Sequence, residues 1–365
     1  MKIKDIINVL ENMASPSLQE DYDNAGLITG NEEDECTGVL CTLDVTEEVV
    51  KEAIQKKCNL VVAHHPIIFR GLKRITGRNY VERVVIDAIK NSVAIYAIHT
   101  NLDNILHGVN GKMADRLALT NRAVLAPRKS VLKKLYTFVP LSHAEEVRLA
   151  LFNAGAGHIG NYSHCSFYAE GTGTFKGEEG SQPFAGTTGE LHLEKEVKIE
   201  VVFPTWIEGK LIQALLAAHP YEEVAYDIIP LDNRHSLTGA GLTGELAQPM
   251  EEKTFLALLK EKFQLKVIRH TRLLNRPIRK VALCGGSGSF LIINALQVKA
   301  DLFITADIKY HEFFDADGRM VIADIGHFES EQFTIELLYD ILVEKFPTFA
   351  VQKTVVNTNP VCYAV

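Results

Sequence analysis

The stretch LVVAHHP, residues 60–66, places two adjacent histidines, His64 and His65, directly after an apolar run. Four consecutive apolar residues before a histidine pair and a proline predict a short buried β-strand. A helical pattern at residues 46–57 precedes this strand, and an earlier strand is predicted at residues 38–43. Strands that alternate with helices predict a parallel sheet, and ligands collect beyond the carboxyl ends of such strands. We therefore expect both histidines to lie at a ligand-binding edge.

The same alternation continues along the chain and returns in its last third. A helix is predicted at residues 80–91 and a strand at residues 93–98, followed by the motif HTNLD. The segment KKCNLVVAHH, residues 56–65, also resembles VKADLFITAD, residues 298–307. An internal duplication would explain this likeness, but the binary pattern of any two βαβ units gives a similar one. Both explanations stay open.

The middle of the chain has a different order of elements. After a basic connector at residues 127–134, we predict strands at residues 135–140, 165–170, 198–203 and 224–230, helices at 144–154 and 208–218, and a Gly-, Glu- and Thr-rich loop at 171–189. Strand-helix-strand repeated twice is the order of a ferredoxin-like α+β module. The predicted fold class is therefore α/β, with a discontinuous α/β domain, residues 1–127 and 232–365, interrupted by an α+β domain at residues 128–231.

Composition narrows the classes of protein. The 365 residues carry 38 Lys and Arg against 46 Asp and Glu, a net charge of −8, which argues against a protein that coats nucleic acid or a membrane surface. Basic clusters at residues 70–78, 128–134 and 269–280 are typical of solvated faces. The six cysteines form no C-x-x-C pair, and neither a signal peptide nor a membrane span is recognisable. We expect a cytoplasmic protein with free thiols.

Five residues at comparable strand–helix junctions are candidate metal ligands. His64 and His65 end one strand, Asp103 closes HTNLD, and His327 and Glu331 lie in DIGHFESE with i, i+4 spacing on one helix face. Singly, an Asp in a turn and a Glu in a first helical turn also have structural explanations. Together, nitrogen and carboxylate donors suit Zn²⁺, Fe²⁺ or Mn²⁺. Five ligands cannot saturate two metals, so positions for water remain open, as hydrolysis requires.

Other residues near predicted strand ends are candidates for supporting roles. In TADIKYHEF, His311 is a candidate general acid or base beside Tyr310, although a histidine that merely begins a helix explains it equally well. His99 and Asp324 are candidates to orient metal ligands. The loop GGSGS, residues 285–289, lies between a strand and a helix, where phosphate binds in other proteins. It lacks the third glycine of a dinucleotide fingerprint and the lysine of a P-loop.

Six motifs in order resemble the signatures of one family. They are YDNAGLITG at residues 22–30, HHPIIF at 64–69, HTNLD at 99–103, CGGSG at 284–288, TADIKYHEF at 305–313 and DIGHFESE at 324–331. The sequence is similar to the NIF-three-like family of GTP cyclohydrolase I type 2 homologues, or dinuclear-metal-centre hexameric proteins. It resembles the long form with a PII-like or CutA-like insert, for which YEEVAYDI, residues 221–228, is the marker. Tyr22 stands where the family has an aromatic residue, often Trp.

The resemblance implies a toroidal homohexamer with two divalent metal ions in each subunit. The family's metal ligands fall here on His64, His65, Asp103, His327 and Glu331, with Glu331 as the bridging carboxylate. Zinc is the first expectation for the metal, and iron or manganese are alternatives.

Three functions are weighed against one another. The first is a metal-dependent, GTP cyclohydrolase-like hydrolase, in which a metal-bound water attacks a nucleotide or a related small substrate and His311 and Tyr310 are the catalytic candidates. The second is a non-enzymatic regulatory hexamer that binds a metal or a small ligand. The third, least favoured by the acidic charge, is a ring that binds single-stranded nucleic acid. We expect no membrane partner.

Overall fold

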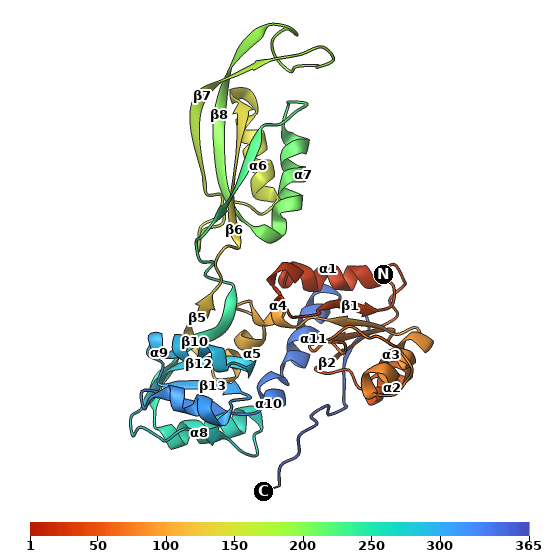
Figure 1. The fold of residues 1–365 in the computed structure, drawn as a ribbon, viewed down its shortest axis with the longest axis vertical. Helices are drawn as coiled ribbons and strands as arrows, with labels where there is room; N and C mark the ends of the chain where they lie inside the picture. The colour runs from red at the N-terminus through yellow and green to blue at the C-terminus, as the bar shows by residue number, and fades with distance from the viewer. Residues whose placement is uncertain (365) are drawn as a thin grey trace. The chain divides into compact units, whose positions relative to one another are not determined.

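The computed structural model describes residues 1–364 and has a mixed α/β architecture with several sheets (Figure 1). The chain divides into two compact units: the first unit joins Met1–Pro127 to Leu237–Val365, and the second unit is Arg128–Ser236. All six cysteines are free thiols. Among the described residues, none of the helices combines the length and the apolar character that a membrane crossing requires.

One sheet of the first unit contains the histidine strand. Its order is β1-β4-β3-β2-β15, with β1 (Gly26–Thr29) antiparallel and with β4 (Ala94–Ala97), β3 (Leu60–Ala63), β2 (Val39–Thr42) and β15 (Val351–Lys353) parallel. Side chains alternate between its faces. Val61 packs among residues of α2 (Glu47–Gln55) and α3 (Tyr80–Lys90), and Val62 packs among those of α1 (Ile3–Met13) and α11 (Thr334–Lys345). Helices therefore cover both faces of this sheet (Figure 1).

The other sheet of the first unit has a similar parallel centre. Its order is β11 (Arg269–His270), β14 (Val321–Asp324), β13 (Leu302–Ala306), β12 (Ile278–Ser287), β10 (Gly239–Met250) and β5 (Thr120–Pro127), and β12, β13 and β14 are parallel. One face packs on α5 (Val109–Arg116) and α8 (Glu252–Phe263), and the opposite face packs on η4 (Ser289–Leu291), α9 (Ile292–Gln297) and η5 (Tyr310–Ala316). Short helices η1 (Pro16–Leu18), α4 (Thr100–Asp103) and α10 (His327–Glu331) complete the unit.

The second unit has its own four-stranded antiparallel sheet, ordered β7-β8-β6-β9. Its strands are β6 (Leu132–Pro140), β7 (Ser166–Lys176), β8 (Leu191–Pro204) and β9 (Tyr226–Leu231), and its helices are η2 (Leu141–His143), α6 (Ala144–Asn153), η3 (Thr205–Ile207) and α7 (Glu208–Ala218). Leu151 of α6 and Leu215 of α7 share one core with Leu135 and Ile199 of the sheet. Both long helices therefore cover the same face (Figure 1).

One predicted loop is wrong in its extent. Residues 171–176 belong to β7 and pair with residues 191–196 of β8, whereas the sequence predicted a loop over 171–189. Glycine and threonine at these positions have weak or mixed strand preference, but pairing with a neighbouring strand outweighs intrinsic propensity. The real connection is shorter, and it places Gly171 and Gly173 on a strand.

Candidate metal centre

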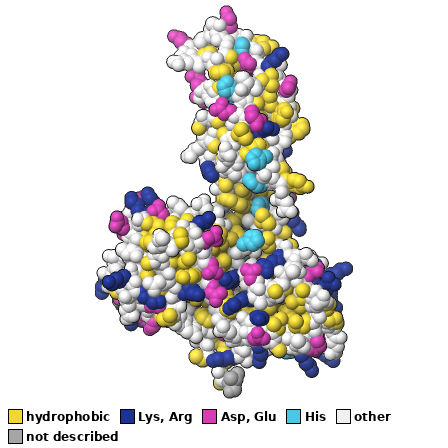
Figure 2. Space-filling view, turned by 180° about the vertical axis from the view of Figure 1, so that it is seen from behind, with side chains coloured by type: hydrophobic (Ala, Val, Ile, Leu, Met, Phe, Trp, Pro, Cys, Tyr) yellow, Lys and Arg dark blue, Asp and Glu magenta, His cyan; other side chains and the backbone are white. Residues whose placement is uncertain are grey.

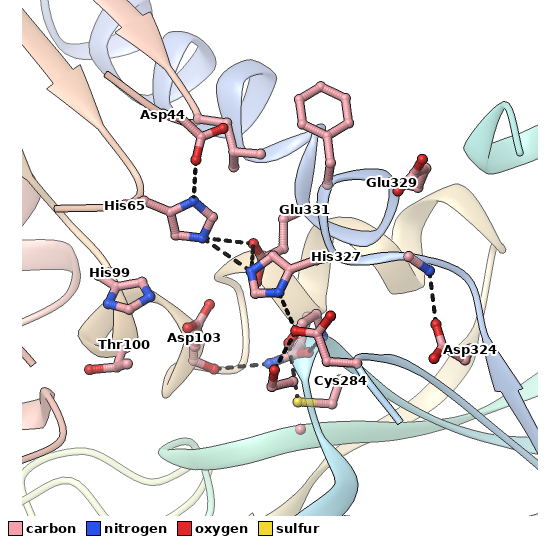
Figure 3. A pocket seen from close by; sticks show the side chains of 18 of the residues that line it. Asp44, His65, His99, Thr100, Asp103, Cys284, Asp324, His327, Glu329 and Glu331 are labelled. Carbon is pink, nitrogen blue, oxygen red and sulfur yellow. Dashed lines mark hydrogen bonds and ion pairs between the residues drawn. The ribbon is translucent and has the colours of Figure 1, made fainter. Parts of the chain in front are cut away.

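The five expected ligands come together in the first unit from both of its sheets. Figure 3 shows His65, Asp103, His327 and Glu331. His64 and His65 directly follow β3, and Asp103 is the last residue of α4, which follows β4. His327 and Glu331 begin and end α10, beyond β14. Because the strands that precede them are parallel within each sheet, the side chains gather at carboxyl ends.

The turn into α10 depends on Gly326. Its φ of 94° lies in a region that L side chains rarely adopt, and a Cβ atom there would lie 2.3 Å from Glu329 Oε2. The short helix that follows is only five residues long. Its single turn brings His327 Nε2 to 3.1 Å from Glu331 Oε2.

Glu331 belongs to two groups of three potential ligands. In the first group, His64 Nε2 lies 3.6 Å from Asp103 Oδ1 and 3.9 Å from Glu331 Oε1. In the second group, His65 Nε2 lies 3.0 Å from Glu331 Oε2 and 3.4 Å from His327 Nε2. A further group joins His64 and His65 to His99. The carboxylate of Glu331 is thus common to two adjacent ligand sets.

Oxygen atoms outside the centre fix the three imidazoles. In each ring Nδ1 contacts an oxygen, so that Nε2 is left for the centre, an arrangement typical of metal-binding histidines. The pairs are His64 with the Ile98 carbonyl at 2.9 Å, His65 with Asp44 Oδ1 at 2.7 Å and His327 with Asp307 Oδ2 at 2.6 Å.

Unsatisfied buried atoms test whether a cation fits here. Among the described residues, His64 Nε2, Asp103 Oδ1 and Glu331 Oε2 have no hydrogen-bond partner of acceptable geometry, although Glu331 Oε2 lies close to two imidazoles. Leaving a buried polar group unsatisfied costs about 1–3 kcal/mol. A divalent cation with a preference for nitrogen and oxygen donors would satisfy all three atoms. The residues therefore fit such a cation.

Burial and neighbouring charges shift the pKa values of the site residues. Burial lowers the pKa of His64 to about 3, and burial together with the Glu331 carboxylate raises the pKa of Asp103 well above its ordinary value. Burial alone would also raise the pKa of Glu331, but contacts with His327 and His65 hold it well below its ordinary value. Burial opposes protonation of His65, yet Asp44 and Glu331 raise its pKa to about 9. Positive charge is therefore favoured beside Glu331.

The glycine-rich end of β12 makes room for Glu331. The sequence predicted a loop at residues 285–289, but residues 285–287 belong to this strand. The Gly285 amide donates to Asn110 Oδ1 at 2.9 Å, and the Gly286 amide donates to Ser330 Oγ at 3.0 Å. These two N–H groups are therefore not free to bind phosphate, which the sequence had suggested. Gly286 has a φ of 62°, and a Cβ atom on it would lie 2.4 Å from Glu331 Oε1. The glycines at the end of this strand allow the backbone to approach the shared carboxylate.

A cavity of about 970 Å³ opens onto this centre. His65, Asp103, His327 and Glu331 line it, and His64 lies fully buried behind them. Its wall also carries five aromatic side chains and one cation: Tyr22, Phe69, Phe290, Phe328, Tyr363 and Arg269. The cavity can therefore hold a ligand of nucleotide size against the candidate metal ligands.

Of the other residues that the sequence suggested, some line the cavity and others do not. His99, Asp307 and Asp324 line the cavity, whereas the described lining includes neither Tyr310 nor His311. Both of these lie in η5, and Tyr310 is 72% exposed.

Sequence reasoning missed three contributors to the site. Asp44 follows β2 and contacts His65. The argument that residues after parallel strands gather at one edge could have identified it. Asp23, inside the YDNAGLITG motif, accepts a 2.8 Å contact from His99 Nδ1. Thr358 Oγ1 donates to Asp44 Oδ2 at 2.6 Å from the C-terminal segment, which carries no local signal for this role.

Fold and site together define an α/β protein with a candidate metal centre at its strand ends. The family model described as Duf34/NIF3 (NGG1p interacting factor 3) matches residues 1–360, and the chain belongs to this family. A Halalkalibacterium halodurans relative, named "GTP cyclohydrolase 1 type 2 homolog", is 42% identical over 361 residues, 97% of each chain. A Bacillus subtilis relative of the same name is 41% identical over 325 residues, 88% of this chain and 87% of its own. The crystal structure of a Bacillus cereus protein related to NIF3 superposes with a TM-score of 0.88 at 40% identity, covering 100% of this chain and 99% of that one.

Proposed function

We propose that this protein is a dinuclear-metal-dependent hydrolase that acts on a nucleotide or a related small substrate. The observation that carries the proposal is the position of Glu331, whose carboxylate belongs both to the group with His64 and Asp103 and to the group with His65 and His327. Two divalent cations held in these groups, with zinc as the first expectation and iron or manganese as alternatives, would supply Lewis acidity and lower the pKa of water. The relatives' shared name, "GTP cyclohydrolase 1 type 2 homolog", supports the same class of reaction.

Proton transfer in this scheme belongs to His99. Its ring lies with its centroid 5.3 Å from those of His64 and His65, and Asp23 fixes its Nδ1. Burial opposes the charged form of Asp23, but contacts with His99 and Thr100 lower its pKa to about 2, so the carboxylate stays ionised. An imidazole oriented by a carboxylate is suited to accept and return a proton. His311 remains a second candidate for this proton transfer.

The aromatic part of the cavity wall suits a planar substrate. The lining is rich in carboxylates, so an anionic substrate would depend on the charge of the two cations together with Arg269. Aromatic side chains such as Phe69 and Phe290 offer surfaces for ring stacking. Arg269 lines the same wall, where it contacts Asp324 and donates to the Ile308 carbonyl at 2.8 Å. A guanidinium group held in place by such contacts can pair with a phosphate.

Metal content and turnover of Glu331→Gln test the proposal. The substitution keeps the size of the side chain and removes its charge, so we expect loss of metal and of hydrolysis in a screen of nucleotides that includes GTP. Glu329→Gln is the matched control for metal content, because Glu329 lies on the same short helix but in neither ligand group. Unchanged metal content in Glu331→Gln, or undiminished turnover in its metal-free form, would contradict the mechanism.

A regulatory role is the second candidate. The second unit has the element order β6-α6-β7-β8-α7-β9 and the sheet order β7-β8-β6-β9, which supports a ferredoxin-like, PII-like or CutA-like insert. It also contains a cavity of its own, of about 750 Å³. A protein that only senses a ligand would bind metal and ligand without turnover in the same screen.

The proposed assembly is a homohexamer. Exposed apolar side chains of the first unit support an interface between copies: Phe290, Ile293, Tyr310 and Phe314 are each at least 65% exposed. Light scattering of the purified chain tests this, and a monomer would contradict it. A nucleic-acid-binding ring is less supported, since acidic and basic side chains are interspersed on the face shown in Figure 2 and the net charge is −8.

A further inference from the structure

The cavity in the second unit has no part in the proposed hydrolysis. It is lined by β7, by β8, by the segment that follows β7 and by residues after α7. Glu196 and Lys198 line it and alternate along β8 with Val197 and Ile199, which pack against the helices. Because successive strand residues point to opposite faces, the cavity opens on the face of the sheet that the helices leave uncovered.

Aromatic rings form one wall of this cavity. Tyr221 lies between Phe175 and Phe184, with ring centroids 6.1 Å and 6.0 Å away. His219 anchors the chain at the central ring: its Nδ1 accepts from the Tyr221 amide at 3.1 Å and its Nε2 donates to the Phe138 carbonyl at 3.0 Å. The three rings therefore form an aromatic wall whose middle member is held by the backbone.

A buried carboxylate forms the floor. Glu196 is 8% exposed, and the Tyr221 hydroxyl donates to its Oε1 at 2.8 Å. Its other oxygen lies against Gly173, where a Cβ atom would come within 2.0 Å of Oε2. The strand glycine thus allows the carboxylate to reach this position.

The charge of the lining is negative. Five carboxylates and two ammonium groups line the cavity: Glu170, Glu178, Glu196, Glu222, Glu223, Lys176 and Lys198. The Lys198 ammonium is already paired with Glu200 at 2.7 Å and lies 4.3 Å from the centre of the Tyr136 ring. The lining therefore favours a positively charged ligand.

The chemistry of the lining distinguishes an organic cation from a metal ion. In the part of the chain that the structure describes, every group of three or more clustered metal-ligand side chains lies in the first unit. Aromatic faces beside a carboxylate instead attract ammonium and guanidinium groups through cation–π and ionic contacts. We propose that the second unit binds a small organic cation, an ammonium or guanidinium group on an apolar body, in this cavity.

Choline and its neutral carbon isostere, 3,3-dimethylbutan-1-ol, serve as probes for the full-length protein. Titration followed by NMR or calorimetry compares their affinities. We expect choline to bind at least about tenfold more tightly, because only choline carries the charge that the rings and Glu196 recognise. Equal affinity would mean a merely apolar cavity and would overturn the proposal, as would the absence of saturable choline binding.

Two variants identify the groups responsible. Glu196→Gln keeps an acceptor for Tyr221 and removes the charge, so choline binding should weaken about tenfold while binding of the isostere stays unchanged. Phe184→Leu, at a 51% exposed position where folding is not at risk, should weaken choline selectively by removing a ring. Glu190→Gln, at an exposed position of the same unit that lies outside the cavity lining, is the control. Choline affinity that is unchanged in both cavity variants would overturn the assignment.

Discussion

His65 and His327 each turn Nδ1 toward a carboxylate, Asp44 and Asp307 respectively, and Nε2 toward Glu331. The orientation of each ring is therefore set by a residue that does not itself belong to a ligand group. Asp44 in turn accepts a hydrogen bond from Thr358. Such outer contacts fix the tautomer and raise the basicity of a ligand.

Replacing Asp44 tests this outer layer. Asp44→Ala removes the oxygen that holds His65, and we expect the affinity for Zn²⁺ to fall about 10- to 100-fold while the protein stays folded. Competition with a chromophoric chelator measures the affinity. Asp232→Ala, at a side chain that is 82% exposed, is the control. Equal affinities in the two variants would show that Asp44 has no positioning role.

Gly286 allows a second test at the level of one residue. Gly286→Ala places a methyl group against Glu331 Oε1, so we expect a loss of metal content and a lower free energy of unfolding. Gly160 is the matched control, since its φ of 56° is similar and a Cβ atom there meets nothing within 4 Å. Gly160→Ala should cost only the backbone strain, about 1 kcal/mol, and leave the metal unchanged. Urea unfolding and metal analysis of both variants distinguish strain from steric conflict.

At the scale of elements, the two parallel centres of the first unit share local features. Lys57 and Lys299, which follow α2 and α9, have the same φ of 58°. Two residues after these lysines, the side chains of Asn59 and Asp301 accept hydrogen bonds from backbone amides. The donating amides lie just before β2 for Asn59 and within β12 for Asp301. These correspondences support the internal duplication that the segments 56–65 and 298–307 suggest. β3 is followed by His64 and His65, and β13 is followed by Asp307, which contacts His327.

The attachment of α2 predicts a pH dependence. Glu52 contacts Lys56, Thr354 and the Val355 amide, which ties α2 to the segment after β15. Burial opposes its ionisation, but these contacts lower its pKa below the ordinary 4.5. Its stabilisation is therefore complete above that ordinary pKa and is lost as the pH falls through the lower folded-state value.

Glu52→Gln measures this contribution. Near pH 7 the variant should be less stable by about 1–3 kcal/mol in urea unfolding, because charged hydrogen bonds are lost. Near pH 3 the difference from wild type should shrink, since the wild-type carboxyl is then protonated in most unfolded molecules and increasingly in folded ones. A difference that does not change with pH would contradict an electrostatic origin.

At the scale of the whole molecule, each unit has its own hydrophobic core, and the candidate metal ligands all belong to the first unit. A ligand that binds only the folded state stabilises the unit that holds it, by about 2.7 kcal/mol at a concentration of 100 times Kd. We expect calorimetry to resolve two unfolding transitions. Chelation with EDTA should lower the midpoint of one of them, and the same treatment of Glu331→Gln should change neither. An equal shift of both transitions would contradict independent units.

Much of the fold could be predicted because burial patterns are local. The strand at residues 60–63 and the helix at residues 208–218 are confirmed with identical bounds, since apolar runs and helical periodicity define them without help from distant residues. The antiparallel strands β10 and β1 were not recognised. They contain glycine and polar residues, and their neighbours in the sheet come from elsewhere in the chain.

The sequence alone determined that His64 and His65 end a buried strand and that His327 and Glu331 lie one helical turn apart, because each relation spans a few residues. Only the tertiary structure decided that the Nε2 atoms of His65 and His327, 262 residues apart, lie 3.4 Å from each other. The same holds for the contact of Thr358 with Asp44. Local periodicity specifies which face of an element is buried, whereas the packing of two sheets specifies which strand ends meet. The shared position of Glu331 between two ligand groups is a product of that packing.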